Sequence, residues 1–304
     1  MKRVKVVLDF DGTLTDEARQ ARELKGIAQR MLAEKILKVP LKDVKRRYNR
    51  VRKAILSSPH KYHWSVNGLK ATYAHEGAYL LNTSILQEVM RSDLNYLRAV
   101  MRKFPANALD SVTLASNHLF HRGTIQVDPH FLKGAEELLV ELIKHPTIDP
   151  VILTNSETRK IEKNLKALNI GRKGTRNRFA YEIEILGDTR QYHMDPDWEQ
   201  YFEHHRYGST QILPVNEKFS IDLRRPVYHA ALKRILEEGF DEVVVVADGL
   251  SLAGALPLVM GLTFVLKKTG YTPEWCETCV REHPNGRVVN DLAELKEYLF
   301  GLVA

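Results

Sequence analysis

Short β-branched runs and longer helical patterns alternate along this chain of 304 residues. The runs are too short for helices, which predicts strands buried on both faces. Strands that alternate with helices are typical of a parallel, doubly wound α/β sheet. The predicted strands are residues 4–8, 151–156, 181–186, 243–246 and 263–266, and the predicted helices around them are residues 129–143, 157–168, 228–238, 253–260 and 291–302.

A long segment separates the first predicted strand from the next. About 115 residues lie between the turn after the first strand and the helix that rejoins the sheet, and a loop of that length is unusual in a compact domain. We therefore predict a core formed by residues 1–15 and 125–304, and a helical domain formed by residues 16–124.

Within the predicted helical domain, we expect helix over residues 17–56, with a break at Pro40, and over residues 76–104. Residues 57–75 are expected to form a loop, and the pattern over residues 109–120 does not decide between alternatives. Residues 187–222, in the core, form either a long loop or a small second insertion.

The charge of the chain is positive, with 45 Lys and Arg residues against 38 Asp and Glu residues and a net charge of +7. This excess suits an anionic substrate but is too diffuse to establish a nucleic-acid partner. The densest basic stretch is either a solvated helix face or a polyanion-binding surface. Its only aromatic residue is Tyr48, which argues against stacking of bases. The stretch contains Lys38, Lys42, Lys45, Arg46, Arg47, Arg50, Arg52 and Lys53.

The chain has two cysteines, Cys276 and Cys279, which we expect to be reduced and in a surface loop. Their small number, and an N-terminal stretch that lacks a secretory pattern, predict a cytoplasmic location. No apolar run reaches the roughly 20 residues that span a bilayer, so no membrane association is expected.

Two carboxylates follow the first predicted strand. Asp9 and Asp11 bracket one residue, and a bend at Gly12 would turn both side chains toward the same volume. One carboxylate could then attack a substrate while the other moves protons. Because two close carboxylates repel each other, a divalent metal, or a phosphate with a metal, is the expected partner.

The sequence Leu-Asp-Phe-Asp-Gly-Thr-Leu-Thr at residues 8–15 resembles motif I of the haloacid dehalogenase-like (HAD) hydrolases. Most members of that superfamily are magnesium-dependent phosphatases that act through an aspartyl-phosphate. The resemblance implies a Rossmann-like core, with Asp9 as the nucleophile and Asp11 as the acid and base. It also implies that residues 16–124 form a C1-type cap.

Two further stretches match phosphate-binding motifs of the same family. Thr154 ends the second predicted strand, followed by Asn155, where a Thr is either a helix cap or a ligand of a phosphoryl oxygen. The resemblance favours the second role. Arg225 precedes Pro226 at a predicted helix start, which fits the cation of motif III, although Arg224 and Lys218 are rivals. The predicted substrate-binding residues are Thr154, Asn155, Arg225 and Gly12.

The predicted metal site is completed after the strand 243–246, where Asp248 matches the acid of motif IV. Magnesium would be held by Asp9, the backbone carbonyl of Asp11 and Asp248. The sequence departs from the motif at Ala247, where a glycine is usual, and at Ala253, where a second aspartate often stands. Loss of the second acid would either weaken the affinity for magnesium or leave its orienting role to Ser251.

We therefore predict a magnesium-dependent phosphomonoester hydrolase that acts on a small phosphorylated metabolite. A phosphomutase would share the same aspartates, whereas a carbon–halogen hydrolase would not need the acid at Asp11. The alternative from another class is a weak or inactive HAD-like protein that binds a polyanion such as nucleic acid through its basic helices.

Overall fold

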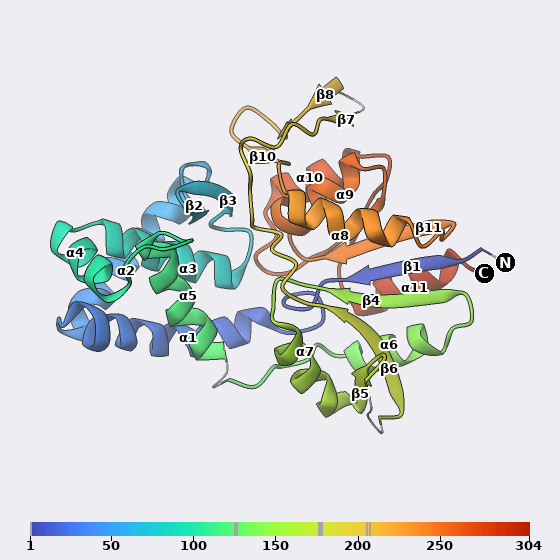
Figure 1. The fold of residues 1–304 in the computed structure, drawn as a ribbon, viewed down its shortest axis with the longest axis horizontal. Helices are drawn as coiled ribbons and strands as arrows, with labels where there is room; N and C mark the ends of the chain where they lie inside the picture. The colour runs from blue at the N-terminus through green and yellow to red at the C-terminus, as the bar shows by residue number, and fades with distance from the viewer. Residues whose placement is uncertain (1, 125–126, 176–178, 205, 207) are drawn as a thin grey trace. The chain divides into compact units, whose positions relative to one another are not determined.

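The computed structural model describes residues 2–124, 127–175, 179–204, 206 and 208–304. The chain divides into two compact units (Figure 1). Residues 1–16 and 129–304 form the first, which we call the core unit, and residues 17–128 form the second, the inserted unit.

A parallel sheet of seven strands runs through the described part of the core unit, in the order β13-β12-β11-β1-β4-β6-β5. Two of these strands, β5 and β13, were not predicted, because three or four residues are too few to establish a period. The strands are β1 (Val4–Leu8), β4 (Ile148–Leu153), β5 (Ile170–Arg172), β6 (Tyr181–Leu186), β11 (Glu242–Ala247), β12 (Thr263–Lys267) and β13 (Gly286–Val289).

Strand β1 lies inside this sheet, between β4 and β11. The chain first builds outward on the β4 side and later on the β11 side, so the direction of winding reverses beside β1. Such a reversal opens a crevice at the carboxyl ends of the strands, where α/β sheets bind their ligands. The predicted doubly wound parallel sheet is therefore confirmed.

Helices cover both faces of the sheet and bury its alternating side chains. Val6 and Leu8 of β1 belong to one fully buried apolar cluster and Val7 to the other. The first cluster includes α6 (Ala135–Lys144), α7 (Thr158–Leu165) and α11 (Leu292–Gly301), and the second includes α8 (Pro226–Leu236), α9 (Ala255–Val259) and α10 (Glu274–Glu282). Burial on both faces explains why β1 and β11 are almost continuously apolar.

The inserted unit is mostly helical. Asp93 caps a new helix by accepting a hydrogen bond from the backbone N–H of Asn95 (2.9 Å), which splits the single helix predicted over residues 76–104. Residues 57–75, predicted as a loop, contain an antiparallel pair of strands, β2 and β3. Its elements are α1 (Glu17–Met31), η1 (Leu32–Leu37), α2 (Leu41–Ser57), η2 (Pro59–Lys61), β2 (His63–Val66), β3 (Leu69–Tyr73), α3 (Ala78–Arg91), α4 (Leu94–Lys103) and α5 (Ser111–Thr124).

The segment between β6 and α8, which the sequence left open, belongs to the core unit. It contains two small antiparallel pairs, β7 (Phe202–His204) with β8 (Gly208–Thr210) and β9 (Ile212–Pro214) with β10 (Ser220–Asp222). The rest of its described residues are turns and irregular structure. Three-residue strands give no readable alternation, which is why the sequence did not predict them.

Both cysteines are free thiols, and they lie on α10 instead of in the expected surface loop. Cys276 is buried, and burial raises the pKa of the Cys279 thiol to about 11. Among the described residues there is no helix both long enough and apolar enough to cross a membrane.

Two histidines of the inserted unit flank the ring of Tyr73. His63 stacks on this ring with a centroid distance of 5.6 Å, and His75 meets it edge-on at 6.4 Å. Burial lowers the pKa of both histidines to about 4, and the charge of Lys70 adds to the effect at His63. Both side chains are therefore neutral in the folded protein at neutral pH.

We predict that the inserted unit loses stability as the pH falls. Below a pH of about 6.5 the unfolded histidines bind protons that the folded ones do not, so the free energy of unfolding should decrease between about pH 6.5 and pH 4. Urea unfolding at several pH values, compared between the wild type and H63Q/H75Q, measures this effect. Equal pH dependence of the two proteins would contradict the assignment.

Candidate active site

The candidate site is built at the carboxyl end of β1. Leu8 pairs with Val246 of β11 on one side and with Ile152 of β4 on the other. The backbone N–H of Asp9 continues the ladder by donating to the carbonyl of Val246 (2.9 Å). Because Thr154 and Asp248 each come two residues after these partners, parallel pairing brings Asp9, Thr154 and Asp248 to the same edge of the sheet.

A tight turn follows Asp9. The N–H of Leu14 donates to the carbonyl of Phe10 (2.9 Å), and Gly12 adopts a φ of +78°, in the left-handed region that glycine enters without steric cost. The carbonyl of Gly12 accepts a hydrogen bond from Nζ of Lys267 (2.9 Å), a buried lysine at the end of β12. The turn is thus held from a third strand of the sheet.

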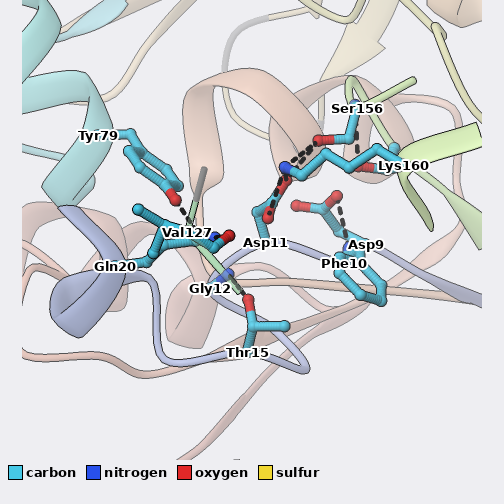
Figure 2. A network of polar contacts seen from close by, with 11 residues as sticks. Asp9, Phe10, Asp11, Gly12, Thr15, Gln20, Tyr79, Val127, Ser156 and Lys160 are labelled. Carbon is cyan, nitrogen blue, oxygen red and sulfur yellow. Dashed lines mark hydrogen bonds and ion pairs between the residues drawn. The ribbon is translucent and has the colours of Figure 1, made fainter. Parts of the chain in front are cut away.

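Figure 2 shows the polar contacts of the two aspartates. One carboxylate oxygen of Asp9 accepts a hydrogen bond from the N–H of Phe10 (2.8 Å). The Asp11 carboxylate accepts from Oγ of Ser156 (2.5 Å) and from Nζ of Lys160 (3.1 and 3.3 Å), and Lys160 also donates to Oγ of Ser156 (2.9 Å). Asp11 is therefore held by the hydroxyl of Ser156, in the loop before α7, and by the cation of Lys160, on the first turn of α7.

The sequence did not predict that Ser156, Lys160 and Lys267 would support the site. Ser156 and Lys160 are four residues apart, the spacing at which side chains meet on one face of a helix, but nothing in the sequence indicates that this face meets Asp11. Lys267 is a lysine at the end of an otherwise apolar strand, which is a signal the sequence analysis did not use.

The loop after β4 begins with Thr154, which is buried and whose Oγ1 accepts a hydrogen bond from the N–H of Ser156 (3.3 Å). This hydrogen bond lies within the loop and does not cap a helix, because α7 begins at Thr158, with Glu157 as its N-cap residue and no side-chain cap. The side-chain amide of the next residue, Asn155, forms two hydrogen bonds with Gln191: Nδ2 donates to Oε1 (3.0 Å), and Oδ1 accepts from the backbone N–H (2.7 Å).

The three candidate cations of motif III have different surroundings. Arg225 is 1% exposed, directly before Pro226 and α8, and donates to the backbone carbonyls of Asp222 (3.0 Å) and Gln191. Arg224 forms two hydrogen bonds with the carboxylate of Asp222, which raise the pKa of Arg224. Lys218 is exposed between β9 and β10.

Tyr228 is a buried residue of α8 that interacts electrostatically with both Asp9 and Arg225. Its hydroxyl is buried and donates to the carbonyl of Ala253 (2.8 Å). Burial raises the pKa of Tyr228, the negative charge of Asp9 raises it further, and the positive charge of Arg225 acts in the opposite direction.

Asp248 is half-buried and follows β11, and Ser251 and Ala253 behind it are buried. Among the described residues no group of three or more His, Cys, Asp or Glu side chains could hold a metal. The predicted site needs only two such side chains, Asp9 and Asp248, and a backbone carbonyl. This set consists of the hard oxygen donors that Mg²⁺ prefers, with further positions left for water and substrate oxygens.

Comparison with known proteins gives matches in structure but none in sequence: no family model matches the chain, and neither does any curated protein. Among solved structures, the HAD-type protein YfnB from Bacillus subtilis, solved with bound magnesium, is 14% identical over 98% of this chain and 99% of its own, with a TM-score of 0.48. A predicted phosphatase from Clostridium acetobutylicum is 14% identical over 99% and 100%, with a TM-score of 0.49. A 2-haloacid dehalogenase from Pseudomonas syringae is 15% identical over 99% and 100%, with a TM-score of 0.43. The chain is similar to each of these three structures over nearly its whole length.

We predict that Gly187, at the end of β6, tolerates no side chain. A Cβ there would lie 2.4 Å from the backbone nitrogen of Thr158 and 2.7 Å from the carbonyl oxygen of Ser156. Because both atoms are backbone, G187A should lower the free energy of unfolding by about 2 kcal/mol or more. Urea unfolding measures the change, with G270A as the control because a Cβ on Gly270 meets no atom within 4 Å. Equal stability of the two variants would contradict this packing.

Proposed function

We propose that this protein is a magnesium-dependent phosphomonoester hydrolase that acts through an aspartyl-phosphate on a small phosphorylated metabolite. The main supporting observation is the pair Asp9 and Asp11 at the end of β1, with Asp11 held by Ser156 and Lys160. The proposed nucleophile and the proposed proton-transfer group are thus two residues apart, directly after a strand end of the kind where such sheets bind their ligands.

In the proposed reaction, a carboxylate oxygen of Asp9 attacks phosphorus and forms a phosphorus–oxygen bond as the bond to the leaving alcohol breaks. Asp11 gives its proton to the leaving oxygen. In the second half, Asp11 takes a proton from a water that attacks the same phosphorus, and the bond to Asp9 breaks, which releases phosphate and restores the Asp9 carboxylate. Ser156 and Lys160 keep the Asp11 carboxylate oriented through both steps.

The phosphoryl group is proposed to be bound by Thr154, Asn155, Arg225 and the backbone at Gly12. The buried guanidinium of Arg225 would neutralise charge on its oxygens, as motif III cations do. Lys267, whose Nζ donates to the carbonyl of Gly12, brings a positive charge to the turn after Asp9. The positive environment suits the dianionic substrate more than a neutral one.

Asp9, Asp248 and the backbone carbonyl of Asp11 would hold the magnesium ion. When bound, the ion neutralises charge on the nucleophile and on the phosphoryl oxygens. Ser251, buried behind Asp248, would stand in for the second acid of motif IV, since Ala253 has no ligand atom in its side chain. The inserted unit occupies the chain position of a C1 cap, which in the family restricts the site to small substrates.

We predict that D9N abolishes turnover while the protein stays folded. The amide is a poor nucleophile, so magnesium-dependent hydrolysis of p-nitrophenyl phosphate should fall by at least about a thousandfold. Circular dichroism and urea unfolding check the fold, and D197N, which changes an exposed aspartate of the core unit, is the matched control.

Activity retained in folded D9N would refute the nucleophile, and activity that survives EDTA would refute the metal. A panel of phosphorylated metabolites then identifies the substrate. A phosphomutase with the same aspartates would convert a sugar phosphate to its isomer without releasing phosphate, so measuring both products separates the two reactions.

The distribution of charge supports a second candidate function, binding of nucleic acid by the inserted unit. Residues 17–128 contain 20 Lys and Arg against 9 Asp and Glu, a net charge of +11, whereas the rest of the chain contains 25 against 29. The outer face of α2 concentrates this charge, because Val44, Tyr48 and Ile55 point to the core of the unit. Its exposed cations are Lys42, Lys45, Arg46, Arg50, Arg52 and Lys53.

If this α2 face binds nucleic acid, K45E/R46E/R50E should weaken binding of a labelled single-stranded RNA and reduce its dependence on salt. Loss of three phosphate contacts lowers the slope of log affinity against log salt by about 2. Fluorescence anisotropy at several salt concentrations measures both effects. K163E/K166E/K233E, which reverses three exposed lysines of the core unit, is the control. Equal weakening by both variants would show a non-specific charge effect.

A further inference from the structure

The segment of residues 187–191 directly follows β6 and lies against the loop that carries Thr154 and Asn155. The N–H of Asp188 donates to the carbonyl of Ser156 (3.0 Å), and the N–H of Thr189 donates to the carbonyl of Thr154 (3.2 Å). We call this segment the 187–191 strap. The strap is the first part of the irregular segment after β6, and it is hydrogen-bonded to the loop after the neighbouring strand, β4.

The strap adopts an unfavourable backbone conformation. Asp188 and Arg190 have φ values of +55° and +46°, in the left-handed region that residues with a Cβ rarely enter. Two buried atoms, Oγ1 of Thr189 and Nε2 of Gln191, have no hydrogen-bond partner within the described residues. Such features persist where the surrounding structure fixes them, and they cluster at functional sites.

Gln191 is the residue of the strap whose side chain contacts a predicted phosphate-binding residue, Asn155. The backbone N–H of Gln191 can only donate, so the Asn155 atom that it contacts must be the acceptor, Oδ1. The second polar atom of the Asn155 amide is therefore Nδ2, which donates. The Gln191 side-chain atom that accepts this hydrogen bond must be Oε1. The two amides are thus locked in one orientation by a backbone group that side-chain substitution leaves in place.

Gln191 also contacts Arg225, whose guanidinium donates to its backbone carbonyl. Both residues are 1% exposed, so solvent does not compete for this contact. One residue therefore touches two predicted phosphate ligands that come from different elements: Asn155 after β4 and Arg225 before α8.

We propose that Gln191 is a positioning residue, which holds the side-chain amide of Asn155 in the orientation that binds the phosphoryl group. This inference rests on the proposed phosphatase function. Without Oε1 the Nδ2 group of Asn155 loses its acceptor, and the amide is then held by one hydrogen bond, from the backbone N–H of Gln191, instead of two. Arg225 keeps its contact with the backbone carbonyl. The loss should therefore affect binding of phosphate more than the chemical step.

The experiment compares Q191L with the wild type. The KM for p-nitrophenyl phosphate and the inhibition constant of inorganic phosphate should rise together by about 5- to 20-fold, with kcat within about twofold. Q191E has the same shape and keeps an acceptor for Asn155, so its KM should return to within about threefold of the wild type.

Q211L is the matched control, because Gln211 lies in the same irregular segment between β6 and α8 and donates to the carbonyl of Trp198 (2.7 Å). Its constants should match those of the wild type.

A cycle with N155A tests whether Gln191 acts through Asn155. The double variant Q191L/N155A should bind phosphate no more than about twofold more weakly than N155A alone. Full multiplication of the two effects would overturn the proposal, as would unchanged KM and phosphate inhibition in Q191L or a Q191E as impaired as Q191L. A wild type that neither hydrolyses p-nitrophenyl phosphate nor binds phosphate would overturn the proposed function itself, and this inference with it.

Discussion

The parallel pairing of β1 with its two neighbours is the constraint on which the site depends. The backbone ladder fixes Leu8 between Val246 and Ile152, and the residues that follow all three strands therefore share one edge. A shift of register by one residue would turn Val6 and Leu8 out of their apolar cluster, so burial of that cluster fixes the position of Asp9 as well. The stability of the core and the geometry of the site have the same cause.

The groups around Asp9 and Asp11 come from many parts of the core unit. Lys267 from β12 holds the carbonyl of Gly12, and Ser156 with Lys160 holds the carboxylate of Asp11. A side chain on a turn has several rotamers, and each such contact removes some of them before a ligand arrives. The site is thus organised by the protein alone, with three lysine and arginine side chains, Lys160, Lys267 and Arg225, in its immediate structure.

The two units have different electrostatic characters. The inserted unit is strongly basic, and the core unit carries a slight excess of acids although its candidate site is surrounded by cations. A phosphorylated small molecule and a nucleic acid would both be attracted by such a charge distribution. The difference lies in the chemistry offered: the α2 face presents exposed, flexible cations, whereas the core unit presents carboxylates and buried donors in fixed positions.

The sequence determined those features of the protein that depend on local pattern. The runs around 4–8, 151–156, 181–186, 243–246 and 263–266 all contribute strands to one parallel sheet. Burial on both faces makes β1 and β11 almost continuously apolar, whereas apolar and polar residues alternate along β6. The glycine in the turn after Asp9 and the proline after Arg225 also mark local backbone conformations that a sequence can reveal.

Only the tertiary structure decided which side chains support the site. Lys160, Lys267 and Gln191 contact residues more than 30 positions away, and the strap that carries Gln191 has no period at all. Hydrogen bonds of this kind depend on the exact approach of packed elements, which hydrophobic spacing does not encode. The sequence by itself therefore determined the sheet and the position of its two aspartates, while the long-range packing decided what holds those aspartates in place.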